Sequence, residues 1–265
     1  MTGEDTLEAA LAAAERQAEA TLKLVAAATS QLRKVRTAAK AGQLRELRRA
    51  LSAAESLSAD AAGGIRQLGV SFDFDEQDYI ASGGYTKELL TAAEAAGLAL
   101  YEEDDRLMCY PSLVRVLSTD SAVEVDKVKE RRIRPSVLVG LLAAAQQRPP
   151  KFKPETFLDS LRGAYELVVA GGAKKADAVV RLVEVWGVLT MLPGAAREYT
   201  KQEFARDLYL LDQTGVVRTS RSARELRWSA STGTKGAGVL VTAARSGQRQ
   251  YYWGVSFTPG DDGAQ

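Results

Sequence analysis

The stretch LEAALAAAERQAEATLKLVAAATSQLRKVRTAA, residues 7–39, decides the first part of the fold. Its apolar and small residues recur at alternating spacings of four and three, which is the heptad pattern of a coiled-coil helix. The members of this first seam are Leu7, Leu11, Ala14, Ala18, Thr21, Val25, Ala28, Leu32, Val35 and Ala39. The spacing predicts one long helix whose alanines let a neighbouring backbone approach closely.

A second seam follows directly, so the chain is expected to fold back on itself. Its members are Leu44, Leu47, Leu51, Ala54, Ser58, Ala61, Ile65 and Leu68. The register breaks at Gly42, and glycine is the residue type at which helices commonly end. The pattern therefore predicts a helical hairpin over residues 1–69. Two roles stay open for it: packing on the protein's own core, or self-association and partner docking through Leu32 and Leu51.

Residues 70–134 have a different pattern, with acidic turns between short apolar runs. The expected elements are a helix over 86–96 and strands over 98–101, 106–110, 112–117 and 122–128. A helix followed by a hairpin is the order found at the end of a winged-helix unit. We therefore expect a small acidic winged-helix-like unit here.

Residues 135–258 are expected to form a basic helical domain that ends in a second winged-helix-like hairpin. The expected helices cover 137–146, 154–169, 176–192 and 200–214, and the expected strands cover 216–219, 225–230, 238–243 and 251–257. Residues 259–265 read as a disordered tail. The predicted fold class is mainly α with small β-hairpins (α+β), in which a coiled-coil-like hairpin precedes winged-helix-like units.

The composition excludes several kinds of chemistry. The 265 residues contain no histidine and a single cysteine, Cys109, so histidine-based triads, zinc fingers and internal disulfides lack their parts. The glycine-rich run 231–238 places Lys235 before Gly236, which is the wrong order for a Walker loop. We therefore expect no enzyme activity, no cofactor and no metal.

Targeting signals are also absent from the sequence pattern. The first residues are acidic, unlike a signal peptide, and no uninterrupted apolar run is long enough to span a membrane. We expect a cytoplasmic protein without a membrane-spanning segment.

The net charge of +1 conceals an uneven distribution along the chain. Residues 1–126 hold 13 basic and 21 acidic side chains, whereas residues 127–253 hold 22 basic and 11 acidic ones. An excess of positive charge is the electrostatic footprint expected for a polyanion partner. The alternative is a solvated surface whose charge is merely uneven.

The basic half supplies candidate nucleic-acid contacts. These are Lys201, Arg206, Arg218, Arg221, Arg224, Arg227, Lys235, Arg245 and Arg249. Arginine donates in a planar fork that fits phosphate oxygens. Strand alternation places Arg227 and Glu225 on one face and Trp228 on the other. Arg227 is therefore expected to be held by Glu225, which makes it a weaker candidate than its neighbours.

These observations predict a non-catalytic protein that binds duplex DNA. The basic C-terminal domain would contact phosphates, and the hairpin would mediate self-association or partner docking. The alternative is an interaction or adaptor subunit of a multiprotein complex, for example with an ATPase or nuclease partner, without direct DNA binding. A salt titration separates the two, because binding through several phosphates weakens steeply with salt.

Overall fold

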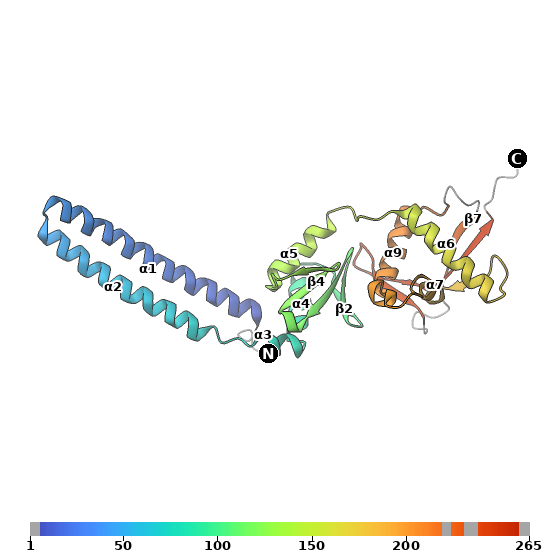
Figure 1. Ribbon diagram of the computed structural model, residues 1–265, viewed down its shortest axis with the longest axis horizontal. Coiled ribbons are helices and arrows are strands. Elements are labelled where there is room, and N and C mark those ends of the chain that lie inside the picture. The colour runs from blue at the N-terminus through green and yellow to red at the C-terminus, as the bar shows by residue number, and fades with distance from the viewer. Residues whose placement is uncertain (1–5, 219–223, 231–237, 260–265) are drawn as a thin grey trace. The chain divides into compact units, whose positions relative to one another are not determined.

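The computed structural model describes residues 6–218, 224–230 and 238–259 (Figure 1). The chain divides into two compact units. The first contains the chain up to Ala92 with Leu117–Ala122 and Arg131–Leu138, and the second contains Ala93–Val116, Val123–Glu130 and the chain from Val139 onward. The structure is mostly helical with small antiparallel sheets, which confirms the α+β expectation. The winged-helix assignment and the finer domain boundaries stay predictions.

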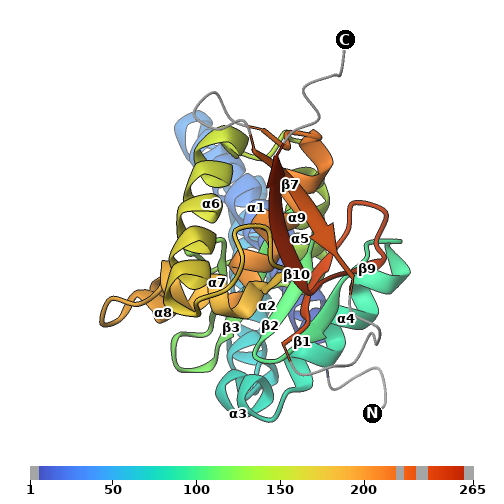
Figure 2. The same cartoon turned by 90° about the vertical axis from the view of Figure 1, so that its right-hand side faces the viewer.

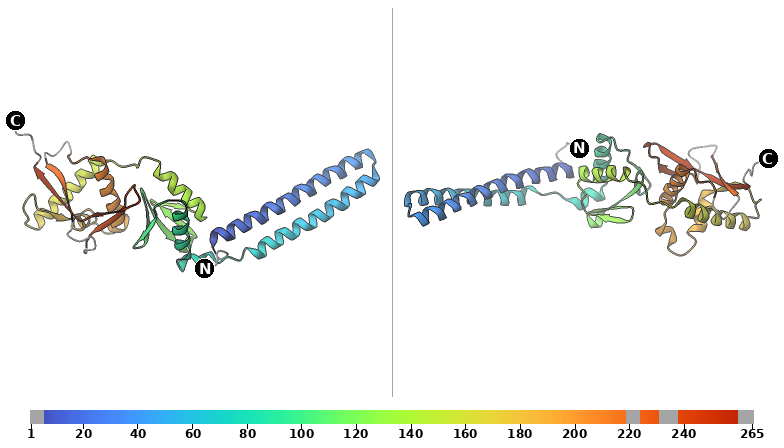
Figure 3. Two further views of the ribbon diagram at one scale, coloured as in Figure 1. Left: turned by 180° about the vertical axis from the view of Figure 1, so that it is seen from behind. Right: turned by 90° about the horizontal axis from the view of Figure 1, so that it is seen from above.

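Two long helices, α1 (Leu7–Ala41) and α2 (Leu44–Ser71), form the predicted hairpin and run side by side (Figure 3). Thr6 caps the start of α1, since its side chain accepts a hydrogen bond from the Ala9 N–H at 3.3 Å. Gly42 ends α1 with a φ of 70°, a left-handed conformation that glycine adopts without steric cost. The register break therefore marks the turn, as the sequence predicts.

Small residues make the contact between the two helices. Thr21 and Ala28 of α1 and Ala54 and Ala61 of α2 are buried. The helices lie close together at Gly64, where an added Cβ would lie 2.6 Å from Thr21 Oγ1. Only about half of each predicted seam is used in this contact: most of the intervening members stay exposed, and Leu11 and Ala18 are half-buried.

The rest of the first unit ties down the open end of the hairpin. It includes α3 (Glu76–Ala81), most of α4 (Gly84–Ala95) and the 3-10 helix η1 (Ser118–Asp120). The Glu88 carboxylate accepts hydrogen bonds from the N–H groups of Leu7 and Glu8, at 3.0 and 2.9 Å. Arg134 pairs with Glu8 and Glu15, both at 2.6 Å. Helix α3 is not among the expected elements; Asp75 caps it by accepting from the Asp78 N–H.

The middle of the chain forms a five-stranded sheet in which successive strands are neighbours. Its strands are β1 (Tyr101–Glu103), β2 (Arg106–Cys109), β3 (Ser112–Leu117), β4 (Ala122–Val125) and β5 (Val128–Glu130). The single strand expected over 122–128 is wrong. Asp126 and Lys127 have φ values of 49° and 68°, so they form a tight turn that separates β4 from β5.

The remainder of the second unit packs helices beside small sheets (Figure 2). Its helices are α5 (Pro135–Gln146), which starts in the first unit, α6 (Pro154–Gly171), α7 (Leu182–Leu189), α8 (Ala195–Glu198) and α9 (Lys201–Thr214). Its strands are β6 (Val180–Arg181), β7 (Arg224–Ser229), β8 (Leu240–Ala243), β9 (Arg249–Tyr252) and β10 (Gly254–Pro259). Helix α9 is central to the core, because Phe204, Leu208 and Leu211 are fully buried within it.

The helix expected over 176–192 is wrong in its first part. Val180 pairs with Val255 of β10, so this segment forms β6, and α7 begins only at Leu182. The run of β-branched valines suits a strand, and its apolar character alone does not distinguish a buried strand from a buried helix.

Three expectations near the C-terminus also need correction. The strand expected over 216–219 is not present in residues 216–218, and Thr219 lies outside the described residues. The single strand expected over 251–257 is two, because Trp253 separates β9 from β10. Pro259, expected in the tail, ends β10. Strand β7 pairs with β10, whereas β8 and β9 form their own hairpin.

Candidate functional site

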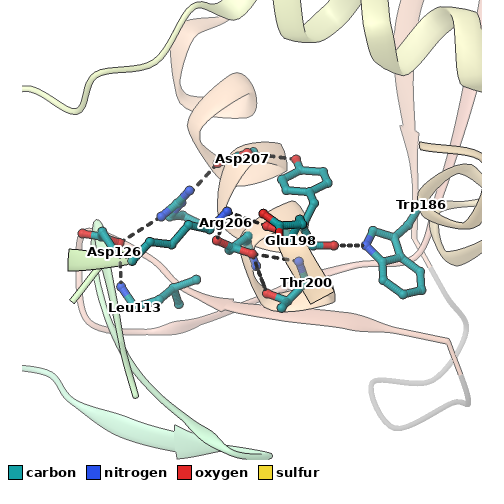
Figure 4. A network of polar contacts seen from close by, with 10 residues as sticks. Leu113, Asp126, Trp186, Glu198, Thr200, Arg206 and Asp207 are labelled. Carbon is teal, nitrogen blue, oxygen red and sulfur yellow. Dashed lines mark hydrogen bonds and ion pairs between the residues drawn. The ribbon is translucent and has the colours of Figure 1, made fainter. Parts of the chain in front are cut away.

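A network of polar side chains surrounds the first turn of α9 (Figure 4). The Thr200 side chain accepts from the Glu203 N–H at 3.3 Å, and the Glu203 carboxylate accepts from the Thr200 N–H at 2.8 Å. This reciprocal capping box fixes the start of the helix. Lys127, from the turn between β4 and β5, pairs with Glu203 at 3.1 Å. Burial raises the pKa of Glu203, but the hydrogen bonds from Thr200 and Lys127 outweigh burial and hold that pKa below its usual range.

Arg206 joins the same helix to the same turn. It pairs with Asp126 at 3.0 Å and with Asp207 at 3.1 Å, and Asp126 also accepts from the Leu113 N–H at 3.0 Å. The Tyr199 hydroxyl donates to Asp207 at 2.9 Å. Burial raises the pKa of Asp207, and the Arg206 guanidinium offsets this only in part. Burial, and then the neighbouring Asp207 charge, raises the pKa of Tyr199.

This network positions elements and leaves little charge available for a ligand. Two clefts, of about 370 and 450 Å³, are both lined by Phe152, Lys151, Arg206 and Asp207. The acidic groups on their walls already hold Arg206 and Tyr199. Within the described part of the chain, no group of three or more His, Cys, Asp or Glu side chains is placed to hold a metal ion.

The candidate arginines around β7 make contacts within the fold. Arg218 and Arg227 both pair with Glu225, at 2.6 and 2.7 Å. Arg224 donates to the backbone carbonyls of Ala176 and Phe257. Trp228 packs against the core, so the predicted alternation along this strand is confirmed. Arg221 and Lys235 lie outside the described residues.

The other candidate cations are not brought together into one cluster with these. Arg206 belongs to the α9 network. Lys201 lies 5.2 Å from the centre of the Trp186 ring, and Arg249 lies 5.0 Å from that of Tyr101. Arg245 is exposed. Arg249 also pairs with Glu103 at 3.9 Å, whereas Lys201 and Arg245 make no ion pair among the described residues. All three keep their charged groups at the surface.

A stripe of exposed apolar residues runs along the hairpin, and we call it the outer stripe. It consists of Val25 (43% exposed), Leu32 (52%), Leu44 (68%), Leu51 (41%) and Ile65 (60%). On each helix these residues are spaced by seven or by a multiple of seven, and Val25, Leu32 and Ile65 each follow a buried member of the seam by four residues. They therefore occupy the e positions of heptads whose a and d positions face the other helix. In an antiparallel pair the e positions of both helices lie on the same flank, so the stripe is one surface.

Comparisons with known proteins add no relative: no family model, no curated protein and no solved structure matches this chain. Among the described residues, no helix is both long and apolar enough to cross a membrane.

Proposed function

We propose that this chain is a non-catalytic interaction protein whose hairpin associates with a second copy through the outer stripe. The observation that carries the proposal is the exposure of Leu32, Leu51 and their neighbours on the seven-residue spacing of a coiled-coil contact. Isolated exposed leucines are ordinary, but a continuous apolar surface marks an interaction site. The buried seam holds the hairpin together, which leaves the outer stripe available for another helix pair.

The stripe suits a second copy because each hairpin presents the same apolar flank on both of its helices. Two such flanks packed face to face give a four-helix arrangement with a two-fold axis. Charge supports an antiparallel pairing of the hairpins. Arg36 lies toward the loop end of α1, whereas Glu19 lies toward its other end. An antiparallel arrangement sets these opposite charges against each other across the contact.

Replacing Leu32 and Leu51 together with glutamate is expected to abolish this association. Two negative charges in an apolar contact must lose water without gaining a partner, which is strongly unfavourable. Light scattering should give the mass of a dimer for the wild-type chain and that of a monomer for the variant. A matched control replaces Leu167 and Leu192 with glutamate, since these leucines are 60% and 72% exposed but lie outside the hairpin.

A wild-type chain that is already monomeric would contradict the proposed dimer. Suppose that the wild-type chain is monomeric, and that the variant with glutamate at Leu32 and Leu51 no longer captures a partner protein that the control variant still captures. The outer stripe then binds a protein other than a second copy of this chain. An unchanged dimer mass in a folded variant would show that the hairpin serves only internal packing.

Binding of duplex DNA by the C-terminal surface is a second candidate. Lys201, Arg245 and Arg249 favour it, because their charges remain at the surface while Arg218 and Arg227 are held by Glu225. Replacing these three with glutamine is expected to reduce the slope of log affinity against log salt by about 0.9 for each phosphate that the variant no longer neutralises. Fluorescence anisotropy with duplex DNA at several salt concentrations measures the slope. Equal slopes for variant and wild type would remove this surface from the DNA site.

A further inference from the structure

The loop end of the hairpin is strongly basic. We call residues 33–49 the hairpin tip; its basic residues are Arg33, Lys34, Arg36, Lys40, Arg45, Arg48 and Arg49, and its only acidic residue is Glu46. We infer that the hairpin tip is a second interaction site, which binds the phosphate backbone of a nucleic acid. This site is distinct from the C-terminal surface, and the only residue that it shares with the outer stripe is Leu44, which is not one of its cations.

The hairpin tip contains a groove between α1 and α2. The groove has a volume of about 670 Å³, and its walls carry three cations, Arg33, Lys34 and Arg49, against one carboxylate, that of Glu46. Ser30 and Gln31 add neutral groups that can bond to phosphate oxygens. Space is available there because small residues such as Ala38, Ala50 and Ala53 lie where larger side chains would fill it.

The positive charges of the hairpin tip are not neutralised by ion pairs within the described part of the chain. Among the described residues, none of its seven basic side chains makes an ion pair, and the helix ends bring them together without acidic neighbours other than Glu46. Arg218 and Arg227, by contrast, share the carboxylate of Glu225. Cations gathered without counter-charges repel each other, and a polyanion relieves that repulsion while releasing its own bound counterions.

The arrangement favours a nucleic acid over an acidic protein. Protein interfaces are enriched in aromatic residues, whereas the hairpin tip has none. Arginine forks match phosphate geometry. The cations from residue 33 to residue 40 span roughly 10 Å of helix axis at about 1.5 Å per residue. A span of that length fits successive phosphates of a strand better than a single small anion.

Binding at the hairpin tip is compatible with self-association. None of the outer-stripe residues lines the groove. Lys34 and Ala53 of the groove wall occupy g positions of the heptads, on the flank opposite to the e positions of the stripe. A dimer formed through the stripe would therefore present two grooves.

The test measures binding of the full chain to fluorescent duplex DNA by anisotropy at several salt concentrations. The tip variant carries Arg33→Gln, Lys34→Gln and Arg49→Gln. The matched control carries Arg16→Gln, Lys23→Gln and Arg66→Gln, which removes three exposed cations of the same hairpin away from its tip. Circular dichroism checks that both variants keep their helices, and light scattering checks that the mass is unchanged.

We expect the tip variant to bind DNA at least roughly tenfold more weakly, with the salt slope reduced by about two to three units, because each phosphate contact contributes about 0.9. The control should bind as the wild type does. The inference is overturned if the tip variant and the control bind equally, or if the wild-type chain does not bind DNA at low salt. Preferential binding of the tip to poly-glutamate over DNA would overturn it in favour of an acidic protein. A change in mass without a change in DNA binding would overturn it as well, since the tip would then serve only the proposed association.

Discussion

Replacing Phe204 with alanine is expected to lower the free energy of unfolding by about 3–5 kcal/mol. Phe204 is completely buried in α9, and its ring lies 6.2 Å from that of Phe157 and 6.1 Å from that of Tyr199, centre to centre. Truncation removes apolar burial and leaves a cavity that these neighbours cannot fill without moving. Urea denaturation followed by circular dichroism measures the loss.

The matched control for this prediction is Gln213→Ala, an exposed position on the same helix. Its effect should lie within about 0.5 kcal/mol, as for most surface substitutions. A loss below about 1 kcal/mol for Phe204→Ala would mean that α9 is not at the centre of a packed core.

Replacing Arg206 with alanine is expected to cost about 3 kcal/mol near neutral pH, since breaking a largely buried ion pair leaves a charge without compensation. Asp207 would keep only its hydrogen bond from Tyr199, and Asp126 loses its ion pair as well. Arg206→Lys is the matched variant. It keeps the charge but loses the planar fork that reaches both carboxylates, so it should recover only part of the stability.

The cost of Arg206→Ala should depend on pH in a definite direction. Burial already raises the pKa of Asp207 above its usual value, so folding favours the protonated carboxyl, and ionisation of Asp207 costs stability as the pH rises through that raised pKa. Without Arg206 the pKa rises further. The stability difference between variant and wild type should therefore be largest at pH 7 and shrink toward about pH 4, near the unfolded pKa of aspartate. Urea titrations at both pH values test this, and a pH-independent difference would contradict the role assigned to Arg206.

The helical hairpin shows how much of the fold local pattern predicts. The heptad spacing and Gly42 suffice for two helices and the turn between them, because both signals act within a few residues. The capping sequence at Thr200 and Glu203 is equally local, and α9 begins close to its expected start. The pairing of Arg227 with Glu225 follows from strand alternation alone.

The candidate sites were harder to predict, because they depend on distant partners. The sequence predicts Arg206 as a phosphate ligand in a basic half. In the structure, Arg206 instead forms an ion pair with Asp126, eighty residues earlier in the chain. Counting charge over residues 1–126 as one acidic half also concealed the hairpin tip, whose seven cations are outnumbered by acids elsewhere in that half. A shorter counting window over residues 33–49 would have found it.

By itself the sequence determined the hairpin, its turn, the helix-rich α+β class and the absence of histidine chemistry. Only the tertiary structure decided which half of each seam faces inward. A heptad stripe wide enough for two contacts does not specify which of its residues pack inside the hairpin and which stay on its outside. Tertiary pairing also turned residues 180–181 into a strand, because β10 supplies the hydrogen bonds that a short run of valines cannot supply for itself. The same reason decides which cations stay available for a ligand: an arginine's charge is neutralised by whichever carboxylate the fold brings near it, and that proximity is not written in the local sequence.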